Sequence, residues 1–118
     1  MFSGDLFQLI QEKSNDLMRA VSRIGQSHEK LAKADMEYNV AKQERVMKLR
    51  DSNMPATLIN VTVRGYPEVA KAKFERDIAI GYLEANKEYI NATKLILRLA
   101  EAQYNREYSN LSVNERML

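Results

Sequence analysis

The stretch that decides the fold is residues 51–67, which reads Asp51-Ser52-Asn53-Met54-Pro55-Ala56-Thr57-Leu58-Ile59-Asn60-Val61-Thr62-Val63-Arg64-Gly65-Tyr66-Pro67. It holds both prolines of the 118-residue chain. Proline interrupts a helix because it lacks a backbone N–H. On either side the chain is rich in good helix formers such as Ala, Leu, Glu and Lys. The sequence therefore predicts one helical domain over 1–118, with helices at about 5–50 and about 67–108, a connector at 51–66 and a C-terminal tail at 109–118.

The first helical segment carries one apolar stripe with the three-and-four spacing of a helix. Its members are Leu6, Ile10, Leu17, Val21, Ile24, Leu31, Ala34, Tyr38, Ala41 and Leu49. Two polar residues, Lys13 and Arg45, interrupt it. Two long helices joined by a short link predict an all-α fold, a long antiparallel helical hairpin that resembles a coiled coil.

The second segment carries two apolar stripes. One contains several small residues: Ala70, Phe74, Ile78, Gly81, Ala85, Tyr89, Ala92, Ile96 and Leu99. The other repeats every seven residues: Leu83, Ile90, Leu97, Tyr104 and Leu111. Because the first segment can cover only one stripe, we expect the chain to form a homo-oligomer, as a dimer, with Leu83, Ile90, Leu97 and Leu111 at the contact. A bundle of three or four segments within one chain is the alternative.

The connector permits two local structures. Asn53 is suited to cap a short helix that begins near Pro55, and Gly65 to end it in the left-handed conformation. The β-branched residues at 59–63 favour an extended segment instead. We prefer the short helix. We also expect Leu58 and Ile59 to be buried across the end of the hairpin, because the connector is too apolar for a free loop.

Composition excludes several kinds of chemistry. There is no cysteine, which removes disulfides and thiolate metal sites, and there is one histidine. His28-Glu29 begins like a zinc-protease helix, but Ala32 stands where the second histidine is required. We therefore expect a partly buried His28, no metal, no cofactor and no enzymatic activity. No apolar run reaches membrane-spanning length, and Asp5 does not fit a secretion signal.

The net charge of +2 is too small to indicate a strong nucleic-acid binder. A basic stripe nevertheless follows one face of the first segment, at Arg19, Arg23, Lys30 and Lys33. Such a stripe can contact phosphates, although a plain solvated helix face looks the same.

Six tyrosines suggest anchors for a protein partner, because tyrosine and arginine are enriched at interface hot spots. The candidate anchors are Tyr82, Arg98, Tyr104, Arg106 and Tyr108. Packing at the edge of the helix seam is the alternative interpretation of the tyrosines.

The connector and the segment after it resemble a family of small helical proteins encoded by phages and prophages of Gram-positive bacteria, often among early genes. The resemblance covers about residues 50–108. It rests on Met54-Pro55-Ala56-Thr57-Leu58-Ile59, Arg64-Gly65, Val69-Ala70 and Lys73-Phe74-Glu75-Arg76-Asp77, and more loosely on Leu99-Ala100-Glu101-Ala102-Gln103. Where such relatives have a glycine before Met-Pro, this chain has Asn53, which also tolerates the left-handed conformation. The family has no assigned active site, so no functional residue carries over.

The resemblance implies a phage accessory protein in the cytoplasm of the infected bacterial host. Together with the absence of catalytic groups, it predicts stoichiometric binding of a host or phage protein, for example as an inhibitor of a host defence system. The alternative function is a nucleic-acid-binding accessory factor in phage replication or recombination. We expect no membrane association.

Overall fold

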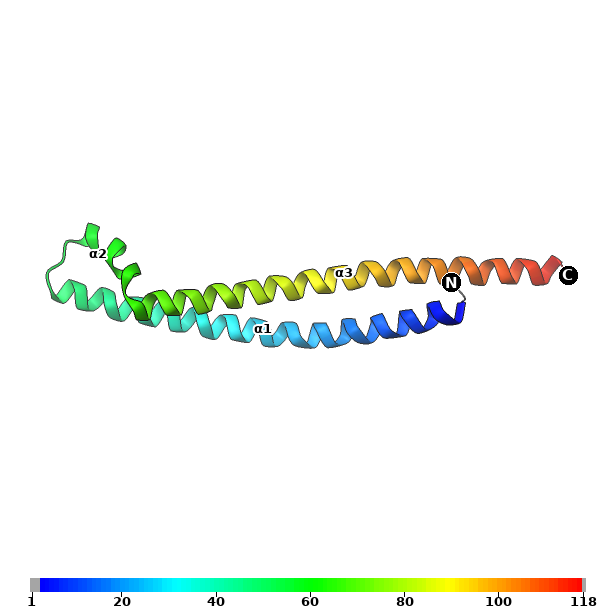
Figure 1. Cartoon of the computed structure of the whole chain (residues 1–118), viewed down its shortest axis with the longest axis horizontal. Coiled ribbons are helices and arrows are strands. Elements are labelled where there is room, and N and C mark those ends of the chain that lie inside the picture. Colours follow the sequence, from blue (N-terminus) through cyan, green and yellow to red (C-terminus); the bar gives the residue numbers. More distant parts are fainter. Residues whose placement is uncertain (1–2, 118) are drawn as a thin grey trace. The chain divides into compact units, whose positions relative to one another are not determined.

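The computed structural model describes residues 3–117, and the side chains of residues 4–111. Three α-helices follow one another along the chain: α1 (Ser3–Asp51), α2 (Ala56–Thr62) and α3 (Pro67–Met117), with a short 3₁₀ turn, η1 (Val63–Gly65), between α2 and α3 (Figure 1). No strand occurs among the described residues, so the predicted all-α class is confirmed. Pro67 is the first residue of α3, where its missing N–H costs no helical hydrogen bond.

Helix α1 agrees with the predicted helix at about 5–50, whereas α3 extends beyond about 108 and runs through the predicted C-terminal tail to Met117. No glycine or proline follows Gly81, so nothing in the local sequence stops the helix.

The contacts divide the described chain into two compact units, each containing parts of α1 and α3. Unit 1 is residues 3–24 and 86–117, and unit 2 is residues 25–85. In unit 1 the ring of Phe7 lies 6.3 Å from that of Tyr104, and Arg23 lies 5.9 Å from the ring of Tyr89. Low numbers on α1 therefore meet high numbers on α3, so the two segments of unit 1 run antiparallel.

Unit 2 has the same antiparallel arrangement and holds the main apolar cluster. Its buried members are Leu49, Ile59, Val63 and Val69, which come from all four elements of the unit. Beside the cluster, the Arg45 guanidinium lies 3.9 Å from the ring of Tyr66, and Arg45 Nε donates a hydrogen bond to Glu68 Oε1 at 2.7 Å.

The end of α1 is fixed by a Schellman motif. Asn53 has the only positive φ, 63°, among the described non-glycine residues. The N–H of Asn53 donates to Arg50 O at 2.9 Å and that of Met54 to Leu49 O at 3.1 Å, the pair of bonds that defines this motif. Met54 also packs against the apolar cluster that contains Leu49.

Two expectations about caps are therefore wrong. Asn53 ends α1 and does not begin α2, whose N-cap is Pro55 without a side-chain hydrogen bond. Gly65 is not left-handed, because η1 leads directly into the extended residue Tyr66. The preference for a short helix over an extended segment is confirmed by α2.

Of the two connector residues that we expect to be buried, Ile59 is buried and Leu58 is exposed. Ile59 is 5% exposed, but Leu58 is 53% exposed. Ile59 and Val63 are four residues apart and therefore share one face of α2 and η1. This face packs on Leu49 and Val69. Leu58 lies on the other side, as does the exposed Val61.

The stripe that repeats every seven residues faces α1 within the chain. Leu83 and Ile90 are buried and Leu97 is partly buried. These three side chains, which we expected to contact a second copy, therefore offer little free surface to one. Leu111, the last member of that set, is exposed.

The apolar stripe on α1 also differs from the prediction in one position. Ala20 is buried, whereas Val21, which we had included, is exposed. The reason is a strict three-four repeat through Lys13, Leu17, Ala20, Ile24, Ser27 and Leu31, in which every member is buried or partly buried.

Candidate interaction surfaces

An apolar groove lies in unit 1, between α1 and α3. It is lined by Leu6, Leu9, Ile96, Leu99, Ala100 and Gln103. Leu6 and Ala100 are buried and form its floor, while Leu99 is 62% exposed and Ile96 is 41% exposed. Exposed leucine and isoleucine in a groove leave apolar surface in contact with water, which a partner side chain would cover favourably.

Helical geometry explains why the groove has this composition. Ala100 belongs to the α3 stripe that faces α1, and its small side chain leaves space for the groove that it lines. Ile96 and Leu99 lie on the neighbouring outward face, because positions three residues apart share a helix face. Both belong to the small-residue stripe that the sequence identified. Leu9 was missed, because its neighbour Ile10 was assigned to the stripe.

Polar residues border one end of the groove. Arg106 Nη2 donates to Gln103 Oε1 at 2.8 Å, and Gln103 Nε2 donates to Glu107 Oε1 at 3.2 Å. Tyr104, the next residue along α3, is partly buried against Phe7. An apolar centre with an arginine at its edge is the usual composition of a protein-binding surface.

The predicted partner-binding residues fall into two groups. Tyr104 and Arg106 lie next to the groove through their contacts with Phe7 and Gln103. Arg98 and Tyr108 are exposed elsewhere on the unit 1 part of α3, and Tyr82 is exposed in unit 2. The structure thus places only Tyr104 and Arg106 close to the groove.

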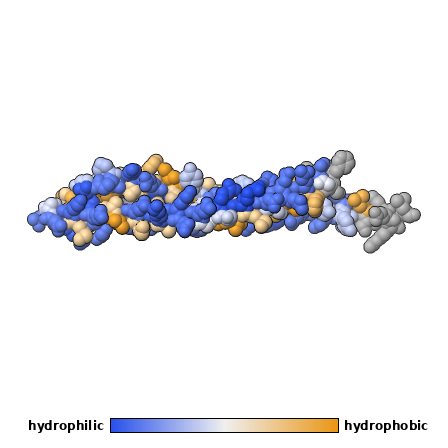
Figure 2. All heavy atoms as spheres, turned by 90° about the horizontal axis from the view of Figure 1, so that it is seen from below, coloured by the Kyte–Doolittle hydropathy of each residue, from blue (hydrophilic) through white to orange (hydrophobic). Residues whose placement is uncertain are grey.

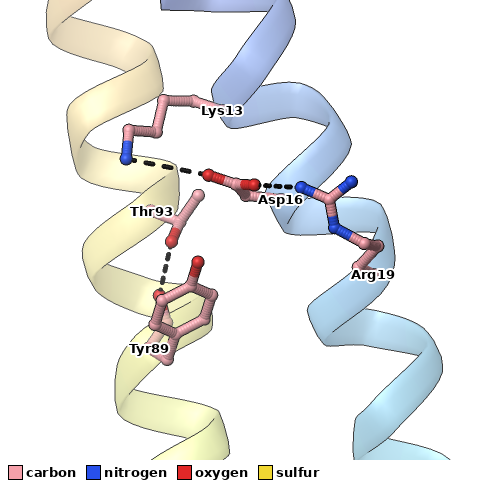
Figure 3. Close-up of polar contacts among 5 residues, drawn as sticks. All are labelled: Lys13, Asp16, Arg19, Tyr89 and Thr93. Carbon is pink, nitrogen blue, oxygen red and sulfur yellow. Dashed lines mark hydrogen bonds and ion pairs between the residues drawn. The ribbon is translucent and has the colours of Figure 1, made fainter.

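The basic stripe consists of four exposed side chains, two of which have partners in unit 1. Asp16 lies between Lys13, at 3.7 Å, and Arg19, whose guanidinium pairs with the other carboxylate oxygen (Figure 3). Arg23 lies over the ring of Tyr89. Lys30 and Lys33 are exposed in unit 2. The carboxylate of Asp16 reduces the positive potential around Arg19.

Two polar positions of the seam differ in how completely they are hydrogen-bonded. Thr93 is buried, and its hydroxyl donates to the backbone carbonyl of Tyr89 at 2.8 Å (Figure 3). In unit 2, Arg76 lies over the Tyr38 ring at 4.5 Å, and its Nη2 donates to Asp77 Oδ1 at 3.2 Å, but its buried Nε has no hydrogen-bond partner among the described residues. The ring and the carboxylate stabilise the charge of Arg76 within the apolar stripe, and the unpaired Nε costs part of that stabilisation.

Two carboxylates of unit 2 have perturbed acidity. The pKa of Glu68 lies below its ordinary value because of a backbone hydrogen bond, with a further contribution from Arg45. The pKa of Asp77 is lowered by its hydrogen bond with Lys73 and by Arg76. Both groups are carboxylates on the helix surface that form ion pairs, Glu68 with Arg45 and Asp77 with Lys73 and Arg76.

A second apolar surface lies on the outward face of α3 in unit 2. Phe74 is 64% exposed and Ile78 is 43% exposed, and Gly81 and Ala85 continue the same face. Figure 2 draws the chain from below the view of Figure 1, and on that drawn face apolar areas in orange alternate with hydrophilic side chains.

Residues suited to metal chemistry are dispersed. Within the described part of the chain, no group of three or more histidine or acidic side chains could hold a metal ion. His28 is exposed, so its expected partial burial is wrong. Among the described helices, none combines the length and apolar character that crossing a membrane requires.

Comparison with protein-family models, with curated proteins and with solved structures finds no match to this chain, so the resemblance to small phage proteins stays a prediction.

Proposed function

We propose that this chain is an antiparallel helical hairpin that works as a small oligomer and acts by stoichiometric binding of another protein, without turnover. The observation that carries the proposal is the open apolar groove of unit 1, where Ile96 and Leu99 remain exposed above Leu6 and Ala100. The occupant that fits such a groove is an amphipathic helix of the partner.

The chemistry of the groove supports this occupant. A groove between two antiparallel helices accepts a third helix, whose apolar side chains continue the existing seam. Five of the six lining residues are aliphatic, and the single polar one, Gln103, is held by Arg106 and Glu107 at the edge. Partner binding through such a surface needs burial of apolar area and no reactive group.

The resemblance to phage early proteins supports a host or phage protein as the partner. We propose that the protein acts in the cytoplasm of the infected host and blocks host machinery, for example a defence system, by occupying it. Occupancy also agrees with the scattered acidic and histidine side chains of the described residues.

The test is affinity capture from host lysate with wild-type protein and two matched variants. Leu99→Glu puts a charge into the groove. Leu95→Glu puts the same charge on an exposed leucine of α3 that does not line the groove. We expect one protein, identified by mass spectrometry, to be retained by wild type and Leu95→Glu and lost with Leu99→Glu. Equal capture by all three would contradict the groove as the binding surface.

The nucleic-acid alternative is favoured by the exposure of Arg19, Arg23, Lys30 and Lys33. It predicts that a fourfold alanine variant of these residues loses function and that affinity for DNA or RNA falls steeply with salt. Binding through the groove predicts instead that Leu99→Glu loses function and that the fourfold alanine variant keeps it. It also predicts that affinity changes little with salt, because burial of apolar surface depends little on ionic strength.

A further inference from the structure

On the outward face of α3 in unit 2, no described part of the chain covers the large apolar side chains Phe74 and Ile78. Phe74, Ile78, Gly81 and Ala85 follow a four-three-four spacing, which places them on one helix face. Arg76 and Leu83, which are buried or partly buried toward α1, lie on the opposite side of the helix. Phe74 and Ile78 therefore point away from α1 and stay exposed in a single chain.

Nothing in the described part of a single chain requires a glycine at position 81. Glycine weakens a helix interior relative to alanine, yet this glycine does not have a positive φ. A Cβ atom built at Gly81 meets nothing within 4 Å, so close packing inside the chain does not require its absence. A glycine on an exposed helix face, next to exposed large apolar residues, is instead suited to the close approach of a helix from outside.

Both large side chains of this face remain in contact with water, since Phe74 is 64% exposed and Ile78 is 43% exposed. Covering them with a second helix removes apolar surface from water, which is favourable.

We propose that a second copy of this chain docks antiparallel on this face of α3, with the two-fold axis between residues 79 and 80. In this register Phe74 of one copy lies opposite Ala85 of the other, and Ile78 lies opposite Gly81. Both pairs are symmetric about the same axis, as a two-fold contact requires. Each large side chain then faces a small one, so the two helices pack closely. The inference rests on the proposed self-association and assigns its surface.

The first test measures mass in solution by light scattering and sedimentation over micromolar concentrations. Wild type should approach about 27 kDa, twice the chain mass of 13.6 kDa. Ile78→Glu should weaken the dimer on the order of 100-fold, because a carboxylate would be buried at its centre. Val40→Glu is the matched control, since Val40 is an exposed apolar residue of α1 in the same unit. Circular dichroism shows whether each variant keeps its helix content.

The second test determines the register with single cysteines, since the natural chain has none. An equimolar mixture of Phe74→Cys and Ala85→Cys should form a disulfide-linked dimer under mild oxidation. Neither variant alone should do so, because two copies of the same position lie about 16 Å apart along the axis. Val40→Cys is the negative control.

The outcomes separate the inference from the broader proposal. A wild-type monomer at all concentrations overturns self-association and this surface together. A dimer that persists in Ile78→Glu, or that cross-links as well through Val40→Cys, overturns this surface and leaves self-association intact. Loss of the dimer in Ile78→Glu with heterologous cross-linking of positions 74 and 85 supports it. The groove in unit 1 is judged separately by the capture experiment.

Discussion

Asn53 determines how α1 ends, because its left-handed backbone turns the chain toward α2. Most residues pay a steric cost at φ 63°, while asparagine and glycine tolerate this conformation. Asn53→Ala should therefore lower the free energy of unfolding by about 1 kcal/mol, whereas Asn53→Gly should leave it nearly unchanged. Chemical denaturation measures both. Equal stability of the alanine and glycine variants would show that the turn does not depend on this conformation.

The tolerance of Asn53 for this conformation was visible in the sequence, but its position in the motif was not. A single asparagine before Met-Pro fits both the end of one helix and the beginning of the next. The backbone bonds from Asn53 and Met54 to the last turn of α1 decide between them. Lys13 and Arg45 show in the same way what the sequence alone could not predict. Each lies in the apolar stripe of α1, and each has a carboxylate partner there, Asp16 and Glu68, that only the structure shows.

Helix α2 presents its two apolar sides to different surroundings, and this difference can be measured. Ile59→Ala should lower the free energy of unfolding by roughly 2–5 kcal/mol, because it removes a buried side chain from the cluster with Val63 and Val69. Leu58→Ala is the matched control and should cost less than about 0.5 kcal/mol, since that side chain is exposed. Urea unfolding gives both values. A larger loss for Leu58→Ala would mean that another copy or segment covers it.

At the scale of helices, the sequence was sufficient to predict two long helices and two apolar stripes on α3. It could not show which stripe faces α1, because both have helical periodicity. The structure places the Leu83–Ile90 stripe inside, as a seven-residue repeat favours in a left-handed pair of helices. The stripe with Gly81 and Ala85 stays outside. The groove in unit 1 was not predicted either. It is formed by residues of α1 and α3 that lie side by side, and the sequence does not show which residues of the two helices are neighbours.

For the whole molecule, the two proposed surfaces lie in different units and share no residue. The groove belongs to unit 1, and the face around Ile78 belongs to unit 2. Effects of substitutions at sites without shared partners usually add. The complex with a target should accordingly contain two copies of each protein in the wild type, and one copy of each when the dimer is broken.

This stoichiometry can be measured with the target identified by capture. Ile78→Glu should bind the target as a one-to-one complex, with an affinity per site within about threefold of wild type. Leu99→Glu should remain a dimer and lose the target. Light scattering of the purified complexes gives their masses, and titration calorimetry gives affinity and ratio. Loss of target binding in Ile78→Glu with unchanged helix content would mean that the target requires the dimer itself, because a monomer with an intact groove would then be insufficient.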